Sequence, residues 1–355
     1  MAESTNLQEV RVGSRKSELA MIQTNGVIEK LKQKFPDVTF EVVTMETIGD
    51  FVQEIPLSSI GQSNLFTKEL EKALAAGQVD MLVHSMKDLP SKLPEGMIIG
   101  AVCERDDPFD ALVLHSKHRG RTLETLPEGS VIGTSSVRRI ALLKHAHKHL
   151  KFKDVRGNVN TRLRKLDEGK DYDGLILATA GMQRMGWDHR ISQVLNDPKY
   201  LYAASQGALG VEVLEQNSSL IKMLSTLNHP ETVLQCVCER ALLRTLQGGC
   251  SAPVAVRTEV TKEQLHLTAA SLSLDGTEMI SKENQSRIPD DLRASAENEE
   301  SLFSNVVAPN ISHSAMMAAE QLGVSVAEEL LKMGADKVLK NAKEEIEKRR
   351  ADISK

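Results

Sequence analysis

The sequence is poor in aromatic residues and cysteine, and it contains no long apolar run. Aromatic side chains make up 3% of the 355 residues, so aliphatic side chains must fill the core. Four cysteines are too few for a disulfide scaffold in a chain of this length. No run of about 18 apolar residues could span a membrane, and the short polar N-terminus lacks a signal-peptide pattern. We therefore expect a cytoplasmic protein with reduced thiols and no membrane partner.

Common cofactor and metal motifs are also missing. Cys236 and Cys238 are separated by one residue, with no second pair or nearby His to complete a zinc site. The sequence has neither G-x-x-x-x-G-K-[ST] nor G-x-G-x-x-G after a predicted strand. These absences argue against a bound metal and against the usual nucleotide-binding loops.

Positive charge is present, but it is concentrated in one segment. The chain has a formal charge of −5. Residues 138–165 contain ten Lys and Arg against Asp154 alone, so this segment carries +9 and the remaining chain −14. A basic segment in an acidic protein indicates an anionic ligand. Nucleic acid is disfavoured, because Phe152 is the only aromatic in the segment and the whole chain is acidic.

Strand-like and helix-like segments alternate over the first two-thirds of the chain. The hydrophobic pattern predicts strands at 10–13, 40–45, 81–84, 130–133, 152–155 and 174–178, with helices at 16–35, 65–76, 137–147 and 160–167. This alternation predicts an α/β fold with two doubly wound parallel sheets. After about residue 228, a long helix at 231–247 and an alternating stretch at 265–273 predict a smaller α+β domain. The polar segment 275–313 is expected to loop out. We assign residues 1–107 and 206–227 to domain 1, 108–205 to domain 2 and 228–355 to domain 3.

Cations follow the predicted strands at the edge where open α/β sheets bind ligands. Helix N-termini, hydroxyls and guanidinium groups together form anion sites, and the arginine fork fits a carboxylate. The basic residues could instead merely solvate helix faces, which suits Lys144, Lys148, Lys151 and Lys153. The candidates at the strand ends are Arg15, Ser17, Lys87, Ser135, Ser136, Arg138, Arg139, Arg156 and Arg184, with Arg162 one turn into its helix.

Two further residues could carry chemistry. Asp88 is the one carboxylate among these cationic strand ends, where it could assist proton transfer or stabilise a developing positive charge. A turn cap before Pro90 is an equally good reading. Cys250 lies in a Gly-Gly-Cys-Ser-Ala-Pro loop and is a candidate nucleophile or attachment point, whereas the pattern around the other thiols indicates packing. Residue chemistry alone leaves the function of Cys250 open.

Seven short motifs occur in an ordered set that resembles the porphobilinogen deaminase family. They are RVGSRKSELA at 11–20, LFTKEL at 65–70, VHSMKDLP at 83–90, GTSSVRR at 133–139, RGNVNTR at 156–162, LATAG at 177–181 and GGCSAP at 248–253. Each motif is weak alone, but the ordered set is highly specific. The polar segment 275–313 exceeds what bacterial members carry and suggests the animal form of the family.

The resemblance implies an enzyme that joins four porphobilinogen units head to tail, with loss of ammonia, into hydroxymethylbilane. The chain would grow on a dipyrromethane cofactor that a thioether holds to Cys250. Asp88 would be the catalytic acid beside Lys87, and segment 51–63 would cover the cleft with Gly49 and Gly61 as hinges. The family precedent is a monomer. The implied cofactor contacts are Lys87, Asp88, Ser135, Ser136, Arg138, Arg139, Arg156 and Arg162, and the implied contacts of the incoming ring or growing chain are Arg15, Ser17 and Arg184.

A binding protein without catalysis is the alternative. Two α/β domains with a cleft between them also resemble periplasmic binding proteins, which hold anions without chemistry. This reading explains the arginines, but it gives Cys250 and the Lys87–Asp88 pair no role.

Overall fold

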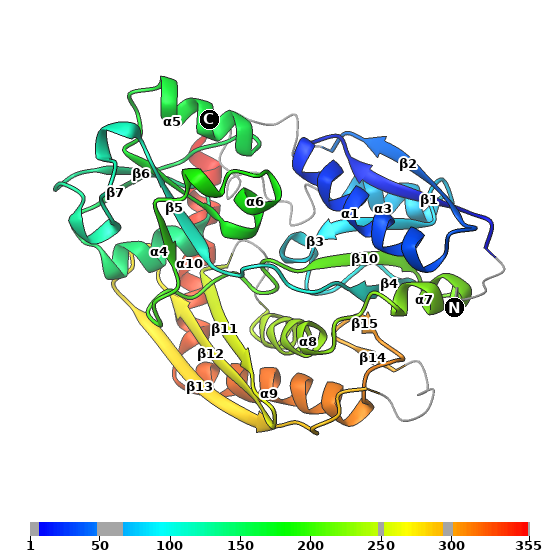
Figure 1. The fold of residues 1–355 in the computed structure, drawn as a ribbon. Helices are drawn as coiled ribbons and strands as arrows, with labels where there is room; N and C mark the ends of the chain where they lie inside the picture. The colour runs from blue at the N-terminus through cyan, green and yellow to red at the C-terminus, as the bar shows by residue number, and fades with distance from the viewer. Residues whose placement is uncertain (1–6, 48–66, 248–251, 294–300, 354–355) are drawn as a thin grey trace.

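A computed structural model describes residues 7–47, 67–247, 252–293 and 301–353 (Figure 1). Within these ranges the chain forms three sheets, of seven, five and three strands. No helix in the described ranges is long and apolar enough to cross a membrane.

The first sheet has the strand order β14-β15-β4-β10-β3-β1-β2. β1 is parallel to both β2 and β3, while β10 runs antiparallel to β3 and β4. Helices α1 and α7 pack on one face through apolar side chains, and α3 packs on the other. The strands are β1 (Glu9–Arg15), β2 (Thr39–Met45), β3 (Met81–Ser85), β4 (Met97–Val102), β10 (Leu209–Leu214), β14 (Leu302–Phe303) and β15 (Val306–Val307), and the helices are α1 (Glu18–Lys34), α3 (Lys68–Ala75) and α7 (Ser218–Ser225).

The second sheet repeats this arrangement in the order β7-β6-β8-β5-β9. β6 is parallel to β7 and β8, and β5 is antiparallel to β8. Helix α4 covers one face, while α5 and α6 cover the other. The elements are β5 (Asp110–Leu114), β6 (Val131–Gly133), β7 (Lys151–Lys153), β8 (Gly174–Ala178), β9 (Gln193–Leu195), α4 (Val137–Ala146), α5 (Val159–Glu168) and α6 (Thr179–Arg184).

The chain crosses between these two sheets twice. Residues 103–109 lead from β4 to β5, and residues 196–208 lead from β9 back to β10. Each crossing delivers an antiparallel strand into the sheet that it enters. The prediction of purely parallel sheets is therefore wrong, because a strand arriving from the opposite sheet enters without the helical crossover that parallel pairing needs.

The last part of the chain builds a smaller unit around an antiparallel sheet. Strands β11 (Val254–Val260), β12 (Gln264–Leu272) and β13 (Met279–Arg287) pair in sequence order. Helix α8 (Pro230–Thr245) lies beneath β4 and β10, and α9 (His313–Lys332) lies beneath α8, followed by α10 (Ala335–Ile353) (Figure 1). Helices α8 and α9 approach so closely that a Cβ at Gly323 of α9 would lie 2.1 Å from the backbone oxygen of Cys238 in α8.

The described parts of the polar segment 275–313, residues 275–293 and 301–313, do not loop out as expected. Its first part is β13, an edge strand with a mostly solvent-facing surface, so it lacks the apolar alternation that marks a half-buried strand. Its later part contributes β14 and β15 to the first sheet, next to β4.

The predicted α/β fold, with two large units that each have helices on both faces of a sheet and a smaller C-terminal unit, is confirmed. The domain boundaries at 107/108, 205/206 and 227/228 stay a prediction.

Candidate active site

The predicted site residues follow strand ends of both large units. Arg15 is the last residue of β1, and Ser17 occupies the N-cap position of α1 without a side-chain capping hydrogen bond. Lys87 and Asp88 lie in a single 3-10 turn, Met86–Asp88, directly after β3. In the second unit, the Ser136 hydroxyl caps α4 by accepting a hydrogen bond from the Arg139 amide, at 3.4 Å. The local sequence therefore places both groups at ligand-binding edges of their sheets.

Contacts between helix starts show that these two edges face each other. The Asn160 amide at the start of α5 donates a hydrogen bond to the Glu18 carboxylate at the start of α1, at 2.8 Å. Leu19 of α1 packs near Gly181 of α6, 3.7 Å from where a Cβ would lie. The residues at the ends of β1 and at the starts of α5 and α6 thus border one common space.

Lys87 and Asp88 are half-buried, and they differ in their partners. Lys87 Nζ donates a hydrogen bond to Gln206 Oε1 at 3.2 Å. Burial lowers the pKa of Lys87 to about 8; the Arg139 charge adds to this effect, and Asp88 opposes it. Among the described residues, none donates a hydrogen bond to the Asp88 carboxylate. The described residues therefore give no support to the interpretation of Asp88 as a turn cap.

Arg138 and Arg139 of α4 bind an internal carboxylate that the sequence did not bring to attention. Arg139 Nη2 lies 2.7 Å from Asp110 Oδ1, and Arg138 Nη1 lies 2.9 Å from Asp110 Oδ2. All three side chains are buried. Burial by itself would raise the pKa of Asp110, but the two guanidinium charges outweigh it and hold the pKa well below its usual range. Both arginines are thus anchored at the first residue of β5.

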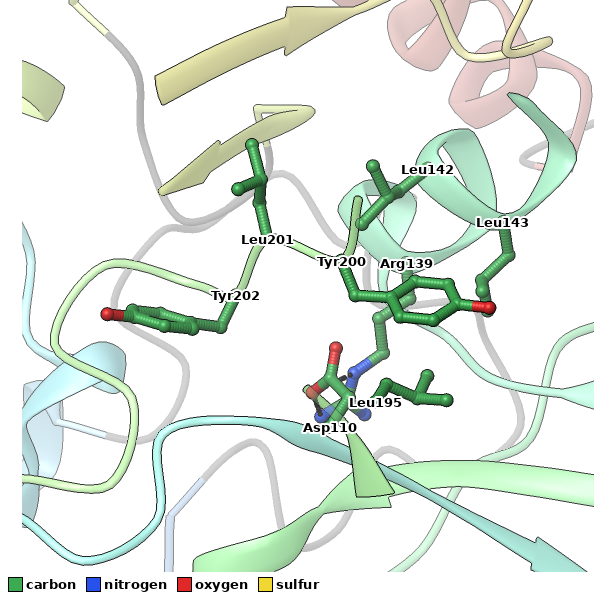
Figure 2. Close-up of a pocket in the computed structure, with 8 residues that line it drawn as sticks. All are labelled: Asp110, Arg139, Leu142, Leu143, Leu195, Tyr200, Leu201 and Tyr202. Atoms are coloured by element: carbon green, nitrogen blue, oxygen red, sulfur yellow. Dashed lines mark hydrogen bonds and ion pairs between the residues drawn. The ribbon is translucent and has the colours of Figure 1, made fainter. Parts of the chain in front are cut away.

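A small pocket next to this ion pair is mostly apolar (Figure 2). In Figure 2, Arg139 reaches from α4 to Asp110, with Tyr200 and Tyr202 of the second crossing nearby. The remaining lining residues are leucines at 142, 143, 195 and 201. Its two charged lining residues, Asp110 and Arg139, already form an ion pair with each other. This pocket therefore does not suit an anionic ligand.

A second pocket joins the three units of the fold. Lys87 comes from the first unit, Ser136 and Arg138 from the second, and Ala252 and Val254 from the C-terminal unit. The Arg138 Nε atom is buried, with no hydrogen-bond partner among the described residues. A buried guanidinium donor without a partner suits an anionic ligand.

The other predicted cations of the second unit lie close enough to influence one another. Burial, together with the charges of Arg139 and Arg156, lowers the pKa of Arg162 to about 10. Burial also lowers the pKa of Arg156. Arg162 Nε donates to the Gly157 carbonyl at 2.8 Å, while the Ser135 hydroxyl donates to the Val155 carbonyl. Such a cluster of buried like charges favours an anionic ligand.

Arg184 has hydrogen-bond partners outside this arginine cluster. Its Nε donates to Asp106 Oδ2 at 2.8 Å, and its Nη2 donates to the Gly207 carbonyl at 2.6 Å. It thereby ties α6 to both crossings between the sheets.

Sequence reasoning missed the buried polar residues at the crossings. Arg105 forms a two-pronged ion pair with Glu239 at 2.8 and 3.1 Å, and its Nε donates to the Gln206 carbonyl at 2.7 Å. Ser205, at φ +62°, and Gly207, at φ +91°, flank Gln206 in left-handed backbone. Glu239 gave a signal that could have been used, because it lies beside Arg240 in a helical stretch whose other residues are mostly apolar.

Several predicted features lie outside the described residues. These are Cys250, the segment 51–63 and its expected hinges Gly49 and Gly61. The three other cysteines are buried, as expected for packing residues.

Comparison with known proteins identifies the family. Residues 10–222 match the model described as "Porphobilinogen deaminase, dipyromethane cofactor binding domain", and residues 233–332 match "Porphobilinogen deaminase, C-terminal domain". The porphobilinogen deaminase of Nostoc sp. is 44% identical over 345 residues, covering 97% of this chain and 98% of the relative. That of Synechococcus elongatus is 50% identical over 277 residues, covering 78% and 86%.

One similar solved structure is a much more distant match. The periplasmic aliphatic sulphonate binding protein SsuA from Escherichia coli has a TM-score of 0.35 and 12% identity, covering 68% of this chain and 71% of that chain. This similarity is too distant to support any conclusion.

The relatives correct one expectation. The expectation that the polar segment 275–313 marks the animal form is wrong, because the two relatives named above are cyanobacterial. The matches with the family models and with these relatives establish that the chain belongs to the porphobilinogen deaminase family.

Proposed function

We propose that this chain joins four porphobilinogen molecules head to tail, with loss of ammonia at each step, into the linear tetrapyrrole hydroxymethylbilane. Growth would begin on a dipyrromethane cofactor attached through a thioether to Cys250. The observation that carries the proposal is the pocket that Lys87, Ser136 and Arg138 line together, beside the Asp88 turn. Family membership supports the same activity.

The residues of this pocket fit a carboxylate-bearing cofactor. Dipyrromethane carries acetate and propionate side chains, and the pocket offers the Lys87 ammonium and the Arg138 Nε, which has no hydrogen-bond partner among the described residues. Ala252, two residues after Cys250, also lines it. When bound, the cofactor supplies the pyrrole carbon to which the first substrate is joined. The residues that would hold it are Lys87, Asp88, Ser135, Ser136, Arg138, Arg139, Arg156 and Arg162.

Asp88 would carry the chemistry on the substrate. As the bond to the departing ammonia breaks, positive charge develops on the pyrrole, and a carboxylate near the ring nitrogen stabilises it. The Asp88 carboxylate accepts no hydrogen bond from the described residues, so it is available to do this. The same oxygen atoms can take up the proton that is released when the two rings join.

The arginines would bind the lengthening product. Each added ring brings two carboxylates, so the site needs several cations, and the mutual repulsion of Arg139, Arg156 and Arg162 is relieved when anions bind between them. Arg15, Ser17 and Arg184 would hold the incoming ring or the growing chain. For this role Arg184 would exchange the Asp106 carboxylate for one from the substrate.

A non-catalytic anion-binding module is not retained as the function. It accounts for the arginines but leaves Asp88 without a role, and the chain belongs to an enzyme family. We further propose that the protein works in the cytoplasm as a monomer. Three buried free thiols agree with a reducing compartment.

Intact mass tests the covalent attachment. We expect the purified protein to be heavier than its sequence by the mass of the cofactor, and the excess to be absent in Cys250→Ser. Cys103→Ser is the matched control and should keep the excess mass. An unmodified protein that still makes hydroxymethylbilane would refute the thioether.

A further inference from the structure

Gln206 is a buried side chain in the second crossing, and the proposed reaction assigns it no role. It is 1% exposed, and it lies between the first unit's Lys87 and the second unit's Asp110. It lies three residues before β10, and its side chain carries no charge of its own. The question is what a neutral amide does between Lys87 and Asp110.

The hydrogen bonds fix which way the amide points. Gln206 Nε2 donates to the Pro108 carbonyl at 2.7 Å and to Asp110 Oδ1 at 2.9 Å. Both partners only accept, so the nitrogen must face them. The oxygen then has to face Lys87, whose Nζ lies 3.2 Å away. One amide therefore satisfies a cation on one side and a carboxylate on the other.

The backbone that carries this amide is held just as firmly. The Gln206 carbonyl accepts a hydrogen bond from Arg105 Nε at 2.7 Å, and Arg105 is paired with buried Glu239. Gly207 has a positive φ, and a Cβ there would lie 2.4 Å from the Asp106 carbonyl oxygen. The amide thus projects from a backbone with little freedom to shift.

A continuous chain of contacts results. It runs from Lys87 through Gln206 to Asp110, and from Asp110 to Arg138 and Arg139 on α4. We propose that Gln206 is a positioning residue, which holds the Lys87 ammonium in a fixed place relative to the anchored arginine pair. The inference rests on the proposed function, because it assigns Gln206 to the same reaction.

Two substitutions of Gln206 should move the titration of Lys87 in opposite directions. Among the described residues, the charged groups that act on Lys87 include Asp88, Asp110, Arg138 and Arg139. Gln206→Leu removes the acceptor that favours the ammonium, which lowers the pKa of Lys87. Gln206→Glu, in its ionised form, places a carboxylate beside Lys87, which raises that pKa, and it also loses the donor to Pro108 and Asp110. A residue that merely fills space would produce no such pair of shifts.

The experiment measures kcat, KM and the pH profile of kcat/KM for the holoenzyme and its variants. Gln206→Leu should lower kcat on the order of 10- to 100-fold, since small misplacements of catalytic groups cost up to about 100-fold. The alkaline limb should move to lower pH in Gln206→Leu and to higher pH in Gln206→Glu. Gln193→Leu is the matched control, because Gln193 also bonds a backbone amide and a carboxylate, Glu124, away from the site; its profile should be unchanged.

The outcomes separate this inference from the proposed function. A wild-type protein that makes no hydroxymethylbilane refutes the proposed function. An active wild type whose Gln206 variants keep the alkaline limb in place refutes the positioning role alone. If Gln206→Leu does not fold, Gln206→Met, which keeps the length of the side chain without either hydrogen bond, carries the test through the same shift to lower pH. Failure of both variants to fold would assign Gln206 a purely structural role and would also overturn the inference.

Discussion

The turn after β3 and the start of α4 present their charged side chains in different ways. In the turn, the Asp88 carboxylate accepts no hydrogen bond from the described residues. On α4, Arg138 and Arg139 are already paired with Asp110, and they are buried with it. The difference suggests a division of labour, in which the first unit supplies the reactive carboxylate of Asp88 and the second supplies arginine side chains held in fixed positions. Substitutions in the two regions should therefore fail in different ways.

The largest expected effect is on stability, at Asp110. Asp110→Ala leaves two buried guanidinium groups without their counter-ion, and breaking a buried ion pair in this way costs roughly 3–5 kcal/mol. We expect a clear fall in the thermal unfolding temperature, measured by calorimetry or circular dichroism. Asp171→Ala, which breaks an exposed pair with Lys153, should leave that temperature nearly unchanged. Equal effects of the two changes would show that the Asp110 cluster is no anchor.

The second largest effect is expected on kcat, when Asp88 is replaced. Asp88→Asn keeps the shape of the side chain but removes the negative charge that stabilises the developing cation. By analogy with other electrostatic groups at reaction centres, the loss in kcat should be roughly 100- to 1000-fold. Steady-state formation of hydroxymethylbilane measures it, and the unfolding temperature should match the wild type. Substantial remaining activity would remove Asp88 from this role.

Substitution of Arg162 should weaken binding more than chemistry. Arg162→Gln removes one charge from the cluster with Arg139 and Arg156, and a hydrogen bond to a charged group is worth about 10- to 100-fold in affinity. We expect KM to rise by this factor while kcat changes little. A fall in kcat at unchanged KM would instead place Arg162 in the chemical step.

Lys87 should give the reaction its alkaline limit. Its pKa, lowered by burial to about 8, lies below that of an ordinary lysine, so the ammonium form is lost as pH rises through about 8. If the ammonium is required, kcat/KM falls above this pH. In Lys87→Arg the charge persists to much higher pH, so whatever activity remains should show no decline near pH 8. A limb that stays near pH 8 in Lys87→Arg would belong to another group.

The smallest effect is expected on the outer surface of the second unit. Lys148 and Lys151 contribute to the basic segment, but both are exposed. Replacing them with Gln lowers the charge of the segment without touching the site. We expect kcat and KM to stay at wild-type values in steady-state assays. A marked rise in KM would mean that overall charge, rather than placement, governs binding.

Local patterns predicted the reactive strand ends, because those depend on residues next to one another. Lys87 and Asp88 follow β3, and Ser136 starts α4, as the motifs indicated. Asp110 and Gln206 could not be found in this way. Their partners lie 29 and 96 residues away along the chain, and neither residue is part of a local motif.

Strand direction and edge strands escaped prediction for a similar reason. β5 and β10 are apolar enough for the interior of either kind of sheet, and their antiparallel pairing follows from the crossings between the sheets. β13 carries Ser, Lys, Glu and Asn on an exposed edge, where no apolar alternation is needed.

The division of labour is tested most directly by single-turnover release of ammonia from the Asp88→Asn holoenzyme at saturating porphobilinogen. Intact mass should first confirm that the cofactor is in place. We predict that the release rate falls at least about 100-fold, while the porphobilinogen concentration needed for half-maximal rate stays near that of the wild type. A wild-type release rate, or a loss that additional substrate restores, would contradict the assignment of the chemistry to the first unit.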